Sequence, residues 1–85
     1  MQIEFLTQQD PNITAFKSVR FPAKVNGADF ECFVSFEALE QKFGSAGDSD
    51  MLQTFLRNRL LIEAVARKNI ETHGIHTKVL GPEDF

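Results

Sequence analysis

The dipeptide Asn26-Gly27 is the feature of this 85-residue chain that most constrains its fold. Asn and Gly readily adopt the two positive φ angles of a type I′ turn, so the dipeptide predicts a tight β-hairpin. A two-residue loop fixes the register and places the apolar residues of both strands on one face. The pairs on that face are Val25 with Ala28, Ala23 with Phe30, Phe21 with Cys32, and Val19 with Val34. A slip of one residue would destroy this sorting, so we predict an antiparallel hairpin over residues 19–34.

Pro22 lies in the middle of the first hairpin strand and has no N–H to donate to a sheet. In the predicted register it faces Glu31 in a non-hydrogen-bonded pair, so its nitrogen points away from the second hairpin strand. The cost of the missing N–H falls on the outer side of the strand. We therefore expect residues 19–25 to form a sheet edge near Pro22, or to be paired there only before it.

Two helices are predicted to follow the hairpin. Ser35 is a suitable N-cap and Gly44 a suitable C-cap for a short helix between them. A long helix is predicted from Ser49 or Asp50 to about Thr72, where apolar residues recur at helical spacing. Such a helix would span roughly 36 Å and cross the whole domain. The residues that we expect on its core face are Met51, Leu52, Phe55, Leu56, Ile62, Ala66 and Ile70.

The complete pattern predicts one α+β domain over residues 1–85, in which 81–85 form a C-terminal tail. Residues 2–6 alternate in polarity and predict a first strand, and residues 75–80 are a candidate last strand. We expect a mainly antiparallel sheet of three or four strands in the order β-β-β-α-α-(β). One face of this sheet would pack against the short and the long helix.

Composition argues against several classes of function. The net charge of −3 argues against a surface dedicated to nucleic acid or to anionic membranes, because phosphate binding needs clustered Lys and Arg. Cys32 is the single cysteine, which excludes an internal disulfide. Neither an export signal nor a long apolar run occurs, so we expect a cytoplasmic protein with no membrane partner. Without nucleotide-binding, zinc-binding or catalytic-triad spacing, we expect no cofactor, no metal and no catalytic residue.

The hairpin and the segment after it also resemble a known family. The residues that carry the resemblance are Val19-x-Phe21-x-Ala23-x-Val25-Asn26-Gly27, Cys32-x-Val34-Ser35-x-Glu37-Ala38-Leu39 and Phe43-Gly44. They resemble domain-of-unknown-function family 1488, which comprises small bacterial proteins of unassigned activity. The similarity continues more weakly through Phe55, Arg59, Ile62 and Ala66. This resemblance implies an α+β fold and a bacterial cytosolic setting, and it supplies no catalytic residue.

Three charged residues on the long helix are candidate contacts for a ligand or partner. Arg59, Glu63 and Arg67 follow i,i+4 spacing within the broad apolar arc. The favoured interpretation is a ladder of ion pairs along the helix. The alternative is a partly buried charged stripe that binds a carboxylate or phosphate, which Arg can contact with two donors. Of the three, Arg59 lies at the position that most needs a partner.

Leu61 and Val65 lie on the opposite side of the same helix and form a candidate dimer or packing ridge. Their cover would be the short helix, the C-terminal segment or another subunit. A long helix with apolar residues on two sides favours a non-enzymatic protein-interaction module that forms a homodimer, beside a protein partner that the sequence does not identify.

Two other functions remain open. One is a small regulatory or nucleic-acid-associated protein that uses the basic residues of the long helix, which are Arg57, Arg59, Arg67 and Lys68. The other is a ligand-binding protein or enzyme centred on Arg59.

Overall fold

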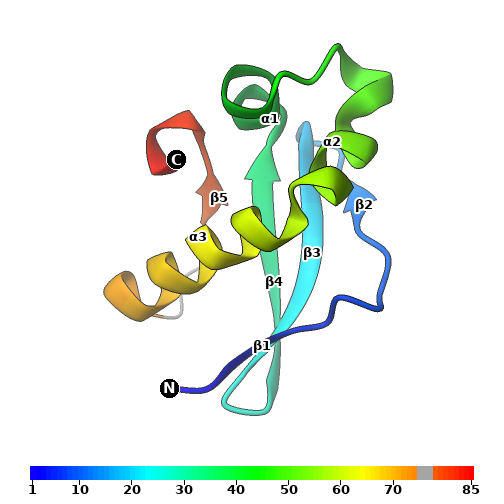
Figure 1. The fold of residues 1–85 in the computed structure, drawn as a ribbon. Coiled ribbons are helices and arrows are strands. Elements are labelled where there is room, and N and C mark those ends of the chain that lie inside the picture. Colours follow the sequence, from blue (N-terminus) through cyan, green and yellow to red (C-terminus); the bar gives the residue numbers. More distant parts are fainter. Residues whose placement is uncertain (75–77) are drawn as a thin grey trace.

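A computed structural model describes residues 1–74 and 78–85 of the chain as an α+β fold (Figure 1). The strands are β1 (Ile3–Phe5), β2 (Asn12–Ile13), β3 (Ser18–Val25), β4 (Ala28–Ser35) and β5 (Val79–Leu80). The α-helices are α1 (Phe36–Phe43), α2 (Met51–Arg57) and α3 (Arg59–His73). Two single-turn 3₁₀ helices, Asp48–Asp50 and Pro82–Asp84, complete the fold. The predicted fold class and the order of strands before helices are confirmed, although the described residues form five strands rather than the three or four expected.

The β3–β4 hairpin is the centre of the sheet and has the predicted register. Val25 pairs with Ala28, and the pairing continues to Ser18 opposite Ser35. Asn26 and Gly27 have φ angles of 53° and 85°, as the type I′ turn requires. The strand order is β1-β3-β4-β5, and β2 also pairs with β3. All pairs are antiparallel except β4–β5, which is parallel.

One face of the sheet is covered by the helices. Figure 1 shows α3 crossing in front of β3 and β4, with α2 at its upper end. The alternation predicted for the hairpin appears in its burial, because Val19, Phe21 and Val34 are fully buried on this face. The other face carries cross-strand ion pairs, Arg20 with Glu31 at 3.2 Å and Lys24 with Asp29 at 3.6 Å. The core therefore lies in a single layer between the sheet and the helices.

The outer side of β3 is paired on both sides of Pro22 rather than free. β2 pairs with Val19 and Arg20, whereas β1 pairs with Ala23, Lys24 and Val25. The expectation of an edge strand, or of pairing only before Pro22, was therefore incomplete. Only the interruption at Pro22 itself is as expected, since neither β1 nor β2 extends to the position opposite Pro22.

The ends of α1 follow the predicted caps. The Ser35 hydroxyl accepts a hydrogen bond from the Ala38 N–H at 3.0 Å. Gly44 has the left-handed φ of 70° that lets the chain leave the helix. The predicted tail is also ordered, since Phe85 packs edge-on against Phe43 with ring centroids 5.2 Å apart. Of the candidate last strand, Val79 and Leu80 form β5, while residues 75–77 lie outside the described residues.

The single long helix predicted from the sequence is two helices that meet at Asn58. Asn58 has φ −118° and ψ 19°, which is outside the helical region. Its side-chain amide donates to the Thr54 carbonyl at 2.9 Å, so a carbonyl at the break keeps a partner. With 15 residues, α3 spans roughly 22 Å and does not have the length expected for the undivided helix.

We expect Asn58→Ala to destabilise the fold by about 1 kcal/mol, because the Thr54 carbonyl loses its side-chain donor. The free energy of unfolding would be measured by urea titration followed by circular dichroism. Gln53→Ala is the matched control, since Gln53 is an exposed amide residue of α2. Equal costs for the two substitutions would contradict a specific role for Asn58 at the break.

Candidate functional site

Arg59 lies at the start of α3 with its guanidinium buried among acceptors of the same chain. Its Nε donates to Glu63 Oε2 at 2.9 Å, and its Nη2 donates to the carbonyls of Leu6 and Gln9, each at 3.2 Å. The Arg59 and Glu63 side chains are only 11% and 6% exposed. The Arg59 Cζ atom also lies 5.6 Å from the centroid of the Phe55 ring. Arg59 thus joins α3 to the loop between β1 and β2.

Pro22 explains why this loop needs a donor from outside the sheet. The Leu6 N–H donates to the Pro22 carbonyl at 3.1 Å, which extends the β1–β3 ladder by one position. In an antiparallel ladder the opposite residue returns a second hydrogen bond, but Pro22 has no N–H to do so. The Leu6 carbonyl would be left without that partner. Arg59 replaces the missing N–H from the side of the helices.

The three charged candidates therefore have different surroundings. Arg59 and Glu63 form a buried i,i+4 ion pair, which is the favoured interpretation of their spacing. Arg67 does not extend the ladder within the described residues. Its guanidinium lies over the Phe5 ring, 5.5 Å from the centroid, and the residue is exposed. A buried ion pair is costly to break because the remaining charge has no water around it.

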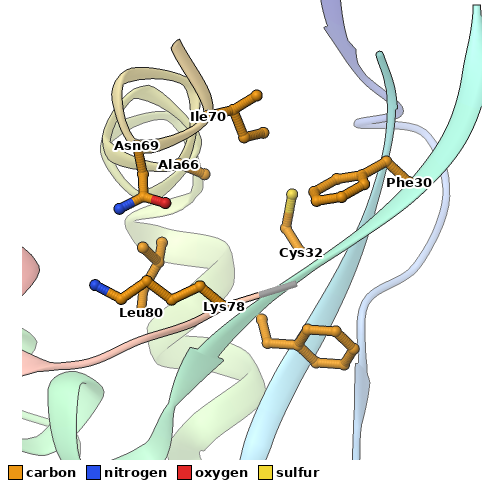
Figure 2. Close-up of a pocket in the computed structure, with 8 residues that line it drawn as sticks. Phe30, Cys32, Ala66, Asn69, Ile70, Lys78 and Leu80 are labelled. Atoms are coloured by element: carbon orange, nitrogen blue, oxygen red, sulfur yellow. The ribbon is translucent and has the colours of Figure 1, made fainter. Parts of the chain in front are cut away.

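Cys32 points from β4 toward α3 into a small pocket, as Figure 2 shows. The pocket lies among Cys32, Phe30, Ile70 and Leu80 and has room for about 10 Å³, the scale of one water molecule. Burial raises the pKa of the Cys32 thiol to about 12, and the nearby Glu63 carboxylate acts in the same direction. The group is therefore a protonated thiol at neutral pH and a poor nucleophile.

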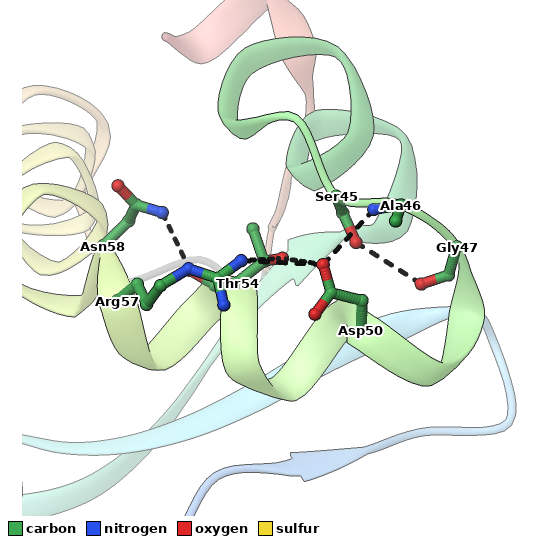
Figure 3. A network of polar contacts seen from close by, with 7 residues as sticks. All are labelled: Ser45, Ala46, Gly47, Asp50, Thr54, Arg57 and Asn58. Carbon is green, nitrogen blue, oxygen red and sulfur yellow. Dashed lines mark hydrogen bonds and ion pairs between the residues drawn. The ribbon is translucent and has the colours of Figure 1, made fainter.

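A second polar network surrounds Asp50 ahead of α2 (Figure 3). Asp50 Oδ2 accepts from the Ala46 N–H at 3.3 Å and from the Thr54 hydroxyl at 3.1 Å, and lies 3.5 Å from Arg57 Nη2. These hydrogen bonds, that from Ala46 first, lower the pKa of the Asp50 carboxyl from its ordinary value of 3.8. The network ties the loop after α1 to the first turns of α2.

The outer side of α2 and α3 carries exposed apolar residues that we call the leucine face. It comprises Leu56, Leu60 and Leu61, which are 45%, 79% and 55% exposed, together with exposed Ala64. Leu56 was expected on the core face, but α2 buries Met51, Thr54 and Phe55 instead. Within α3, the i,i+4 spacing of Leu60 and Ala64 was the sequence signal for this face.

Leu61 and Val65, the residues of the predicted ridge, differ in how far they are exposed. Leu61 is exposed, whereas Val65 is half-buried and packs against the core. Val65 also lines a shallow groove with Glu83 and Asp84, so the chain's own C-terminal segment lies beside it. Of the covers considered for the ridge, the C-terminal segment is the one found near Val65.

Most of the chain matches a known protein family. The family described as "Protein of unknown function (DUF1488)" matches residues 3–79. The chain belongs to the DUF1488 family. The match includes the hairpin, Arg59 and the leucine face, and confirms the resemblance noted in the sequence. No curated protein and no solved structure matches the chain significantly.

Two further searches concern the described residues only. Among the side chains that the structure describes, no group of three or more from His, Cys, Asp or Glu is placed to hold a metal ion. In the same part of the chain, no helix has the length and apolar composition needed to cross a membrane.

The role of Arg59 can be tested by a double-mutant cycle with Pro22. We expect Arg59→Lys to cost about 1–2 kcal/mol, since Lys keeps the charge but cannot donate to Glu63 and the loop together. In a Pro22→Val background the new N–H supplies the Leu6 carbonyl, so the cost should fall by about 0.5 kcal/mol or more. Urea titration of the four proteins measures the coupling.

Arg67→Lys is the matched control for this cycle, because Arg67 lies on the same helix and is exposed. Its cost should be small and equal in both backgrounds. Additive effects of Arg59→Lys and Pro22→Val would contradict the proposed replacement of the missing N–H.

The Asp50 network predicts a dependence of stability on pH. The carboxylate is stabilised in the folded state, so its contribution is complete above the ordinary pKa of 3.8 and is lost as the pH falls through the lowered folded value. Asp50→Asn should lower the free energy of unfolding at neutral pH. The additional decrease that the wild-type protein shows on acidification should be smaller in the variant. Urea titrations at a series of pH values measure both effects. Asp29→Asn is the control, because Asp29 is 88% exposed and lies 3.6 Å from Lys24 Nζ; an equal response would refute the prediction.

Proposed function

We propose that this protein is a non-enzymatic interaction module that self-associates through the leucine face as a homodimer. The observation that carries the proposal is the exposure of three leucines on adjacent turns of α2 and α3, led by Leu60 at 79%. Single exposed leucines are common on soluble proteins, but neighbouring ones on one helical surface are typical of interfaces. Contact between two such faces would remove the leucines from water.

The chemistry of the interior is consistent with a non-enzymatic role. Cys32 is buried and protonated, and Arg59 directs donors toward Glu63, Leu6 and Gln9. A ligand that used Arg59 would have to displace these internal acceptors. For this reason we rank a ligand-binding protein or enzyme centred on Arg59 below the interaction module.

The nucleic-acid alternative has weaker support for a similar reason. Of its four basic residues, Arg59 is buried with Glu63, and Arg57 lies 3.5 Å from Asp50. Arg67 and Lys68 remain exposed, but two cations make a small contribution to phosphate binding. Filter binding at low and high salt tests this alternative, which requires retention that falls as salt rises.

Leu60→Gln tests the dimer. It removes the most exposed apolar side chain of the leucine face while keeping a residue of comparable helix propensity. We expect sedimentation equilibrium to give a dimer for the wild-type protein at high micromolar concentration and a dissociation constant raised at least about tenfold for the variant.

Phe16→Gln is the matched control. Phe16 is 87% exposed in the segment between β2 and β3, so the substitution removes an exposed apolar side chain outside the leucine face. It should leave the dissociation constant unchanged. A wild-type protein that remains monomeric at high micromolar concentration would rule out the dimer.

A further inference from the structure

The turn of the β3–β4 hairpin places an exposed Asn directly before a Gly. Asn26 and Gly27 are both exposed, with φ angles of 53° and 85°. The backbone nitrogen that follows an Asn can close a cyclic imide with the side-chain amide carbon. When the following residue is Gly, no Cβ obstructs that approach. The chemistry of this turn therefore favours the loss of the Asn26 amide as ammonia, which is deamidation.

The reaction consumes one water molecule and releases one ammonia. The Gly27 nitrogen gives up its proton and attacks Asn26 Cγ, so an N–Cγ bond forms and the Cγ–Nδ2 bond breaks. The Nδ2 amino group leaves with that proton as ammonia. Water then hydrolyses the cyclic imide at one of its two carbonyls. Opening at Cγ leaves Asp, whereas opening at the backbone carbonyl leaves isoaspartate, whose backbone runs through the side-chain carbons.

The chain next to β1 holds the Asn26 amide in place. Asn26 Oδ1 accepts a hydrogen bond from the Gln2 N–H at 2.9 Å, and the Asn26 N–H donates to the Gln2 carbonyl at 2.7 Å. These two bonds extend the pairing of β1 with β3 beyond Ile3 and Val25. The Asn26 side chain must therefore give up its bond to Gln2 before it can turn toward the Gly27 nitrogen.

The conformation of the turn is a second barrier to the reaction. Ring closure needs Asn26 Cβ and the Gly27 nitrogen on the same side of the bond between the Asn26 Cα and its carbonyl carbon. In the left-handed conformation that a type I′ turn requires, these two atoms lie on opposite sides of that bond. The turn must therefore open before the cyclic imide can form.

We propose that Asn26 is a deamidation site whose rate is controlled by the pairing of β1 with β3. While β1 is paired, the bond to Gln2 and the closed turn protect the amide. β1 contributes only three residues, Ile3–Phe5, and lies at the edge of the sheet. Short edge elements open more readily than the whole fold, so the amide becomes reactive when β1 leaves the hairpin.

The two products change the hairpin differently. Asp at position 26 keeps a carboxylate oxygen that can accept from the Gln2 N–H, so β1 can pair again. Isoaspartate adds one carbon atom to the backbone between Val25 and Ala28, which form the first pair of the hairpin. A longer loop no longer fits the two-residue turn that fixes the register. Formation of isoaspartate therefore weakens the hairpin irreversibly.

Peptide-mapping mass spectrometry of the full chain during incubation at neutral pH measures the reaction, and isoaspartyl methyltransferase labels the isoaspartate product. Three other Asn residues precede larger residues and are internal controls: Asn12, Asn58 and Asn69. We expect Asn26 to be modified faster than these three. In urea that unfolds the chain, the rate at Asn26 should rise at least about tenfold, since neither β1 nor the turn protects the amide.

Ile3→Ala and Ile70→Ala form a matched pair of variants. Both residues are buried, at 7% and 4% exposed, but Ile3 lies on β1 and Ile70 on α3. Ile3→Ala should raise the rate at Asn26 in the folded protein about tenfold or more, because the loss of buried apolar contacts favours opening of β1. Ile70→Ala should leave it within about twofold, since its contacts remain when β1 opens.

Circular dichroism identifies any variant that fails to fold, and Ile3→Val and Ile70→Val then replace the pair. Ile3→Val should still raise the rate about threefold and Ile70→Val should not. Equal acceleration by the two substitutions overturns control by β1, because the reaction then requires unfolding of the whole chain. A rate that is the same in buffer and in urea overturns the protection. A rate at Asn26 no higher than at the three other Asn residues overturns the site itself.

Discussion

The hydrogen bonds of the Arg59 guanidinium join α3 to the loop that follows β1. The N-terminal strands occupy the outer side of β3, and Pro22 interrupts that side because it has no N–H. The Leu6 carbonyl consequently needs a donor, and Arg59, which lies 53 residues further along the chain, provides it at 3.2 Å. Glu63 compensates the buried charge of Arg59, and its carboxylate in turn adds to the raised pKa of Cys32. The N–H that Pro22 lacks thus explains why the Arg59–Glu63 ion pair is buried between α3 and the loop after β1.

The break at Asn58 determines which side chains of α2 and α3 are buried and which are exposed. α2 buries Met51, Thr54 and Phe55, whereas α3 buries Ile62, Ala66 and Ile70, so the two helices bury different arcs. A single helical wheel drawn over both helices averages these arcs. That average placed Leu56 on the core side, although the structure leaves it 45% exposed. The leucine face is therefore a consequence of two short helices in sequence rather than of one long helix with two apolar sides.

The features that the sequence predicted correctly are those set by neighbouring residues. The hairpin register follows from the Asn26-Gly27 turn, and both ends of α1 follow from Ser35 and Gly44, since each depends on backbone angles or hydrogen bonds within a few positions. The pairing on both sides of Pro22 and the acceptors of Arg59 are contacts over long sequence distances. Residue type indicated that Arg59 needed a partner, but backbone carbonyls have no sequence signature. The break at Asn58 depends on a hydrogen bond to the Thr54 carbonyl, and the propensity of Asn to break a helix is too weak to predict it.

Several basic side chains of this small domain are engaged in ion pairs within the chain. Arg59 is needed in the interior, Arg57 lies next to Asp50, and Arg20 and Lys24 pair with acidic residues on the open face of the sheet. Exposed leucines reduce solubility and contribute little to a core, so the packing of α2 and α3 on the sheet does not account for the exposure of Leu56, Leu60 and Leu61. Because Arg59 is engaged by Glu63 and by the loop between β1 and β2, its charge belongs to the interior and not to the surface that α2 and α3 expose.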